Sequence, residues 1–417
     1  MGLARKLVVV VGGVAVGGIA VATVASAQQK VTGPVAVYWM SASTQTGFGM
    51  PGAGGAANPQ AMMQAMMGGG GANKSLTLQL GSSQAAPAPA ADHLPPQGLG
   101  AGAALPLVSP KVTPTAPVER GPEIPREYQK PRGRMLIFWG CGERARPGQP
   151  VVIDFATLSK NPTAAMNAFK GIDVRPQTPP SAYRNKTYGE WPNERTRTSV
   201  SATGSLVGGH TVRGNYSPQI NFSLDEDQDF LGPLNLTTNA RAPGGWVNLG
   251  WNLVGNAEAY LATAVGGNGE TVVMWSSSET QSAGFAMPEY LTTPDITRLV
   301  GNRTLMGPTQ RTCAVPKEVL DAMPQGIVQM AAYRGEANFA YPPRPTDPKV
   351  AWNQQWAVKV RYRSATGGLL GQAMPQMPGG YQQPSRPGAP APQPGQPPRR
   401  PSAGDILRGL PGLPFPR

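Results

Sequence analysis

The sequence predicts an all-β protein with two antiparallel β-sandwich domains, long Pro- and Gly-rich insertions and a disordered C-terminal tail. Short apolar runs, many alternating with period two, are separated by turn residues. A peptide is also repeated: residues 39–51 return as residues 275–288 with one residue inserted, and a weaker copy surrounds Trp139. The 53 Gly and 46 Pro disfavour long helices. We therefore expect duplicated β modules, with the tryptophans of the three copies at equivalent positions.

The N-terminal residues predict export from the cytoplasm. Arg5 and Lys6 precede an uncharged apolar stretch, residues 7–25, and Ala25-Ser26-Ala27 is the small-x-small pattern that signal peptidase cuts. We expect residues 1–27 to be a signal peptide and the rest of the protein to be periplasmic or extracellular. The apolar stretch also approaches the ~20 residues that span a bilayer, so an uncleaved membrane anchor is the alternative.

Composition divides the remaining chain into two domains and a tail. Residues 28–243 are expected to form an N-terminal β domain, interrupted by a Gly-, Ala- and Met-rich insertion at about 50–73. A second insertion, rich in Pro and Ala, covers about 85–131 and is expected to wrap or link rather than to form a core. Residues 244–365 form the second domain, and residues 366–417 are a disordered Pro-rich tail.

Alternating or continuous apolar segments mark the individual strands. In the N-terminal domain these segments are residues 35–38, 76–80, 135–139, 151–155 and 210–222. In the second domain they are residues 246–251, 259–265, 271–275, 311–315, 327–333 and 356–362. About seven short strands with turns between them are typical of an antiparallel sandwich.

The second domain carries one short family motif. The segment from Trp251 to Tyr260 resembles the second-to-third strand crossing of fibronectin type III domains, where a core Trp is followed by a core Tyr. The resemblance covers about residues 245–275. It implies an immunoglobulin-like sandwich that acts as a binding or spacer module without chemistry of its own.

The charge balance predicts the class of partner. The chain has 36 Lys and Arg against 23 Asp and Glu, a formal net charge of +13. A basic surface outside the cytoplasm attracts anionic lipid headgroups, acidic polysaccharides or cell-wall polymers. We expect an envelope protein or an anionic surface polymer as partner and no nucleic acid, with membrane contact only if residues 1–27 stay uncleaved. The alternative is that the Arg-rich tail supplies much of the charge and the folded part is only mildly basic.

The two cysteines, Cys141 and Cys313, have two interpretations. In an oxidising compartment they are expected to pair in a disulfide, although two buried free thiols are the alternative. The other interpretation is a secreted hydrolase in which Cys141 is the nucleophile and His210 its base. The spacing of Cys141 and His210 in the sequence does not favour this catalytic pair.

The candidate metal site is an acidic cluster. Asp225, Asp227 and Asp229 alternate along a loop, and alternating carboxylates can supply the oxygen ligands that Ca²⁺ prefers. A solvated acidic turn is the alternative. The sequence suggests no other cofactor, and two histidines do not support a His-based zinc site.

The candidate binding surface lies late in the second domain. Trp352 and Trp356 stand close in the sequence to Arg344 and Lys349, a combination suited to stacking on sugars or to anchoring a protein partner. Burial in a sandwich core is the alternative for each Trp.

Together these observations predict an exported, noncatalytic protein of the cell envelope that acts as a structural or interaction module. Two alternatives remain: a carbohydrate- or polyanion-binding protein with a calcium site, and the Cys141 hydrolase.

Overall fold

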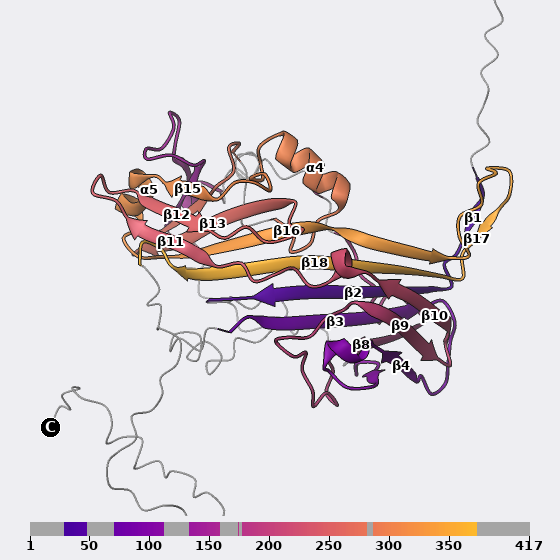
Figure 1. The fold of residues 1–417 in the computed structure, drawn as a ribbon. Helices are drawn as coiled ribbons and strands as arrows, with labels where there is room; N and C mark the ends of the chain where they lie inside the picture. Colours follow the sequence, from indigo (N-terminus) through magenta and orange to yellow (C-terminus); the bar gives the residue numbers. More distant parts are fainter. Residues whose placement is uncertain are drawn as a thin grey trace, which may run out of the picture. The chain divides into compact units, whose positions relative to one another are not determined.

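The computed structural model describes residues 29–47, 71–111, 133–158, 174, 177–281 and 287–372. The chain divides into two units, Met1–Pro375 and Gln376–Arg417. Every described residue belongs to the first unit. The predicted signal peptide, most of the insertion at 50–73 and most of the tail lie outside the described residues. Strands dominate the described part (Figure 1), and the all-β prediction is confirmed.

The fold is built on one sheet of nine strands. Its strands, in spatial order, are β7 (Val151–Asp154), β6 (Arg134–Trp139), β14 (Thr271–Ser276), β13 (Ala259–Asn268), β16 (Gly326–Tyr341), β18 (Trp356–Leu369), β2 (Ala36–Gln45), β3 (Asn73–Ser82) and β8 (Thr187–Trp191). The pairs β6–β14 and β2–β18 are parallel and the others antiparallel.

Three smaller sheets and a few helical segments complete the described part. The four-stranded sheet has the order β10 (Ser217–Leu224), β9 (Gly208–Gly214), β4 (Ala91–Leu94), β5 (Leu105–Leu107), and the three-stranded sheet β11 (Leu236–Arg241), β12 (Val247–Trp251), β15 (Thr312–Val315). A parallel pair joins β1 (Val31–Thr32) to β17 (Trp352–Asn353). The helical segments are η1 (Gln97–Leu99), α2 (Phe155–Leu158), η3 (Glu226–Gln228), α4 (Thr293–Gly301) and α5 (Lys317–Ala322).

The expected boundary between residues 243 and 244 does not divide this sheet. In Figure 1, β2 (indigo) lies beside β18 (yellow), although the two strands come from opposite ends of the described chain. β6 and β14 also pair across the expected boundary. Periodicity identifies a strand but not its partner, because the alternation of side chains is the same whichever strand lies beside it.

The second insertion is also more ordered than its composition predicts. Within residues 85–111, the strands β4 and β5 pair with each other, and β4 also pairs with β9. Leu99, Leu105 and Leu107 are buried in the main core. The expectation that this segment would wrap or link rather than form a core is wrong for its described part. Even a strand as short as β5 places alternate apolar side chains, Leu105 and Leu107, against the large sheet.

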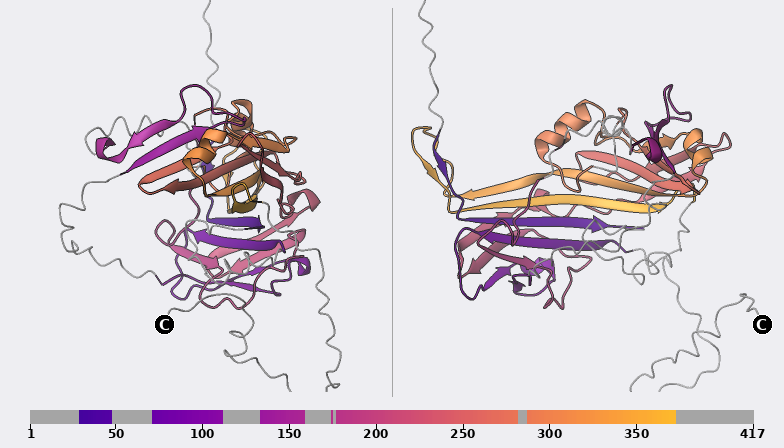
Figure 2. Two further views of the ribbon diagram at one scale, coloured as in Figure 1. Left: turned by 90° about the vertical axis from the view of Figure 1, so that its left-hand side faces the viewer. Right: turned by 180° about the vertical axis from the view of Figure 1, so that it is seen from behind.

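The core lies on one face of the large sheet. β18 shows the alternation: Trp356, Val358, Val360 and Tyr362 are buried in the main core, whereas the residues between them are only half-buried. The four-stranded and three-stranded sheets contribute buried side chains to this same core. Figure 2 gives two further views of how the sheets are arranged. The opposite face carries a smaller core in which α4 packs on β13 and β16.

The large sheet contains two halves of related construction. Each half is built on a hairpin, β13–β14 in one and β16–β18 in the other. Beside the second strand of the hairpin lies a parallel strand, β6 or β2, and beside that an antiparallel strand, β7 or β3. The strands β2 and β6 begin alike, after Gly33 and Gly133, which have φ values of 90° and 102°. A Cβ at either glycine would collide with a backbone carbonyl oxygen of the hairpin, so glycine is needed for the close approach.

This arrangement corrects the expected equivalence of the tryptophans. The segments of Trp39 and Trp139 occupy the same place in their halves, on β2 and β6, while Trp275 lies on β14, the counterpart of β18. Trp275 belongs to the main core, and Trp39 points to the opposite face. The weaker sequence copy is therefore the closer structural match to the first.

Candidate functional site

The candidate site is the tip of the β16–β18 hairpin, defined here as residues 341–355 together with residues 29–32. This connection contains β17, which pairs with β1, and the resulting two-stranded ribbon extends from one end of the large sheet (Figure 1). The other hairpin, β13–β14, closes with residues 269–270 alone. The tip is therefore additional to what the sheet requires.

Arg344 and Trp352 meet at the tip, as the sequence analysis proposed for a binding surface. The guanidinium carbon of Arg344 lies 5.5 Å from the ring centroid of Trp352. The indole Nε1 of Trp352 donates to the carbonyl oxygen of Pro342 at 2.9 Å, which fixes the ring. Arg344 Nε donates to Gln29 Oε1 at 2.8 Å, and Gln29 Nε2 donates to the carbonyl oxygen of Val350 at 3.0 Å. These bonds tie the first described residue of the chain to the tip.

The other two residues of the predicted surface behave differently. Trp356 is buried and stacks on Tyr341, with ring centroids 5.7 Å apart, so it supports the base of the tip from the core. Lys349 is exposed, and its backbone N–H donates to the carboxylate of Asp347 at 2.8 Å. The structure thus leaves Arg344, Trp352 and Lys349 at the surface.

Large apolar side chains are exposed at the same tip. Val31, Tyr341 and Val350 are 51%, 47% and 50% exposed. Periodicity could not have identified this group, because β1 and β17 are too short to show a pattern and are joined only by the folded structure.

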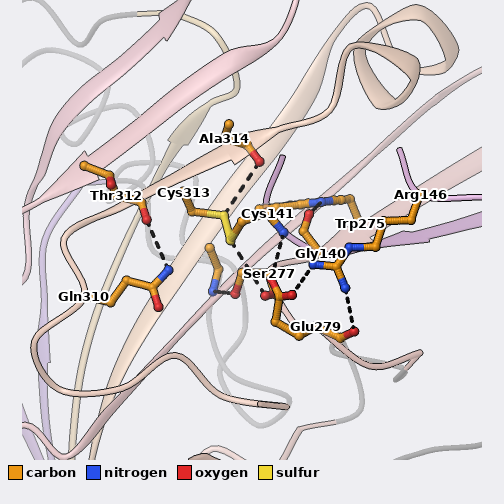
Figure 3. The surroundings of a disulfide bond; sticks show 11 residues. Gly140, Cys141, Arg146, Trp275, Ser277, Glu279, Gln310, Thr312, Cys313 and Ala314 are labelled. Atoms are coloured by element: carbon orange, nitrogen blue, oxygen red, sulfur yellow. Dashed lines mark hydrogen bonds and ion pairs between the residues drawn. A yellow bond between two sulfur atoms is a disulfide. The ribbon is translucent and has the colours of Figure 1, made fainter. Parts of the chain in front are cut away.

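The two cysteines are joined in a disulfide (Figure 3), with their Cα atoms 5.1 Å apart. Cys141 follows β6 and Cys313 lies on β15, so the bond ties the large sheet to the three-stranded sheet. Next to the disulfide, the indole of Trp275 donates to the carbonyl oxygen of Gly140 at 3.0 Å. A disulfide-bonded sulfur is not a thiolate, and it therefore cannot be the nucleophile of the alternative hydrolase.

The two histidines lie together in the core, away from the disulfide. His210 Nε2 lies 2.7 Å from the carbonyl oxygen of Leu206, which can only accept, so this nitrogen carries the proton. His210 Nδ1 then accepts from His93 Nε2 at 3.2 Å, and His93 Nδ1 accepts from the hydroxyl of Tyr38 at 2.8 Å. The chain of bonds places both imidazoles in the neutral Nε2–H form.

The protein environment stabilises these uncharged forms. Burial, followed by the neighbouring His210, lowers the pKa of His93 well below its usual value. Burial also lowers the pKa of His210, although its bond to Leu206 acts in the opposite direction. The pKa of Tyr38 is raised, first by burial and then by Tyr216. His210 is thus part of a closed internal chain and does not serve Cys141 as a base.

The three aspartates of the predicted calcium site have separate roles. Asp229 accepts hydrogen bonds from the hydroxyl of Ser205 and the backbone N–H of Leu206, both at 2.7 Å. Asp225 caps η3, and Asp227 accepts from Asn256 at 3.4 Å. The described residues contain no group of three or more His, Cys, Asp or Glu side chains that could hold a metal ion. Calcium binding therefore stays a prediction without a gathered ligand set.

A cluster of basic and aromatic side chains that the sequence patterns did not predict lies on the face opposite the main core. The guanidinium of Arg361 lies between the rings of Trp39 and Tyr290, 4.7 and 4.5 Å from their centroids. Its Nε also donates to the hydroxyl of Ser41 at 3.1 Å. Burial lowers the pKa of Arg361 and raises that of Tyr290 to about 12.

The neighbours of Arg361 on β18 are neutralised. Lys359 pairs with Glu336 at 2.6 Å, and Arg363 pairs with Glu289 at 3.2 Å. The alternation of basic residues in β18 was visible in the sequence, but the position of Tyr290 was not. We interpret the cluster as internal support for this face of the sheet.

Replacing Arg361 tests that interpretation. We expect Arg361→Gln to lower the free energy of unfolding by about 2 kcal/mol, because two stacked aromatic contacts in a partly buried place are lost. Arg363→Gln, on the same strand and face, is the matched control. Its ion-pair partner Glu289 is half-exposed, so we expect a loss below about 1 kcal/mol. Equal losses in urea unfolding would contradict a special role for the stacked guanidinium.

Trp251 and Tyr260 carry the expected resemblance to fibronectin type III domains. Both residues are buried, with ring centroids 5.9 Å apart, on strands of different sheets.

No helix in the described part of the chain is long and apolar enough to cross a membrane. Comparison with protein-family models, curated proteins and solved structures gives no match to this chain.

Proposed function

We propose that this protein is exported and serves the cell envelope as a noncatalytic structural and interaction module. The observation that carries the proposal is the tip, where an extra connection holds Arg344 and Trp352 at the surface beside the residues that follow the export segment. Such a tip is not needed to close the hairpin, since the related hairpin closes with residues 269–270. Additional connections on a rigid sheet are common places for binding.

The noncatalytic part of the proposal is supported by the use of the reactive side chains. The sequence has two cysteines and two histidines. The cysteines are bonded to each other, and the histidines are bonded to each other and to Tyr38 in the core. Sandwich layering of the sheets and a fibronectin III-like origin of residues 244–365 belong to the same proposal, supported by the buried contact of Trp251 with Tyr260.

Export and thiol state can be measured together. We expect the protein in the envelope or extracellular fraction, with both cysteines resistant to alkylation until a reductant is added under denaturing conditions. The intact mass should correspond to a chain beginning at Gln28, or to the full chain if the segment stays as an anchor. Recovery in the cytoplasm with two alkylatable thiols would contradict the proposal.

A further inference from the structure

The tip has an unusual place relative to the N-terminal segment. The apolar residues 7–25 end only four residues before Gln29, and four extended residues span at most about 14 Å. Gln29 and β1 are bonded into the tip. If residues 7–25 occupy a bilayer during export or as a lasting anchor, the tip is therefore held at the membrane surface.

The exposed side chains of the tip fit such a surface. Val31, Val350 and Tyr341 are about half-exposed, and Val31 lies opposite Trp352 in the β1–β17 pair. Aliphatic and aromatic side chains of this kind favour the boundary between headgroups and acyl chains.

The charges of the tip have the matching sign. Lys30, Arg344 and Lys349 are all exposed. Among the ion pairs between described residues, none involves these three side chains. The nearby acidic side chain, Asp347, accepts a backbone N–H of its own loop. The tip therefore carries an excess of positive charge suited to anionic headgroups.

A bilayer fits these observations better than an acidic polysaccharide. Sugars bind aromatic residues through an open ring face, but the guanidinium of Arg344 lies over Trp352, and the indole nitrogen is bound to Pro342. The exposed aliphatic side chains Val31 and Val350 gain little from contact with a hydrated sugar chain. In a lipid surface they would leave water and enter the apolar boundary, which is favourable.

We propose that the β16–β18 tip is a membrane-docking surface, in which Lys30, Arg344 and Lys349 contact anionic lipid headgroups while Val31, Tyr341 and Val350 enter the interface. The inference rests on the proposed export and names the partner of the same site. It predicts that the fold is held with the β1–β17 ribbon toward the bilayer from which the chain emerges.

Vesicle binding tests the proposal directly. The exported form beginning at Gln28 is mixed with phosphatidylcholine vesicles, with or without phosphatidylglycerol, and the bound fraction is measured by co-sedimentation at increasing salt. We expect binding only with the anionic lipid, weakening as salt rises. The variant Lys30→Gln/Arg344→Gln/Lys349→Gln should lose on the order of 100-fold in partition coefficient, because each basic residue contributes about fivefold.

A matched variant controls for net charge. Arg213→Gln/Arg241→Gln/Arg311→Gln removes the same charge from exposed positions outside the tip and should change binding by less than about threefold. The variant Val31→Ser/Val350→Ser should weaken binding while keeping its salt dependence. Its effect separates insertion at the interface from simple charge attraction.

Two results would overturn the docking surface. One is equal loss of vesicle binding in the two triple variants, which would assign binding to overall charge. The other is binding to a soluble acidic polysaccharide such as alginate without binding to anionic vesicles. Either result leaves the proposed export intact, since that is decided separately by fractionation and thiol alkylation.

Discussion

Replacing both cysteines by alanine should lower the free energy of unfolding by about 4 kcal/mol, the largest single effect that we expect in this protein. Cys141 and Cys313 are separated by 172 residues, and a cross-link over so long a loop strongly restricts the unfolded chain. The bond also joins two different sheets, so its loss removes a tie between parts of the core. Urea unfolding at neutral pH measures the difference.

Reduction provides the control for this prediction. Dithiothreitol should destabilise the natural protein by a similar amount and leave the Cys141→Ala/Cys313→Ala variant unchanged. Two backbone bonds next to the disulfide do not depend on it: Gly142 N–H donates to Ala314 at 2.9 Å, and Lys317 N–H donates to Glu143 at 3.0 Å. We therefore expect a weakened but folded variant. A loss below about 1 kcal/mol would show that these neighbouring bonds hold the junction alone.

Acidification should destabilise the protein in a pH window set by its two histidines. The pKa values of His93 and His210 are both below the usual value of about 6.5 in the folded state. The unfolded chain therefore binds more protons at any pH between the folded and unfolded pKa values. Stability is complete above about pH 7.5 and decreases as the pH falls through 6.5 toward the folded pKa values.

The slope of this decrease is expected to be steep. While both imidazoles stay neutral in the folded state, each lowers the free energy of unfolding by about 1.36 kcal/mol for every unit that the pH falls. The two together lower it by about 2.7 kcal/mol per pH unit. The rings that face the pair are those of Tyr38 from β2 and Phe222 from β10. Neither side chain can offset a positive charge, since Tyr38 is neutral at acid pH and Phe222 is apolar.

The variant His93→Gln/His210→Gln isolates the effect. Glutamine keeps hydrogen-bonding groups in the core but does not titrate, so the variant should lose the slope between about pH 5 and 7 whatever its stability at neutral pH. Thermal or urea unfolding across that range gives the comparison. A variant with the same slope as the natural protein would assign the acid sensitivity to other groups.

Local patterns in the sequence were sufficient to locate most strands. The alternation from Trp356 to Tyr362 lies within β18, and the apolar run at residues 135–139 lies within β6. The Gly-Gly-Asn-Gly sequence at residues 266–269 marked the β13–β14 turn only approximately, because its first three residues still pair within β13 and the turn is residues 269–270. β8 was missed because its short segment, Thr187–Trp191, contains too few apolar residues to alternate clearly.

The arrangement of those strands could not be predicted in the same way. Parallel pairing of β2 with β18 and of β6 with β14 depends on contacts between distant residues. A repeated peptide is also a poor guide to position, since the copies around Trp39 and Trp275 point to opposite faces of the sheet. The hydroxyl-rich residues after Trp39 continue β2 to Gln45, whereas those after Trp275 leave β14 at Ser276. The two copies therefore share a composition but not a structural place.

The candidate site was predicted in part. Arg344, Trp352 and Lys349 lie at the tip as their proximity in the sequence suggested, whereas Trp356 turned out to be core because it occupies the inward phase of β18. Gln29 and Val31 were absent from the prediction, since they reach the tip across more than 300 residues of chain. His93 and His210 also meet only because β4 and β9 pair.

The pairing of β2 with β18 constrains how the protein is made. β2 is among the first strands to be synthesised, but its parallel neighbour β18 is complete only when almost all of the folded unit has been made. Until then this edge of β2 is open to pairing with other chains, so we expect folding to depend on chaperones that keep the polypeptide unpaired. Products that terminate before Trp356 would lack the strand between β16 and β2, and we expect quality-control proteases to remove them.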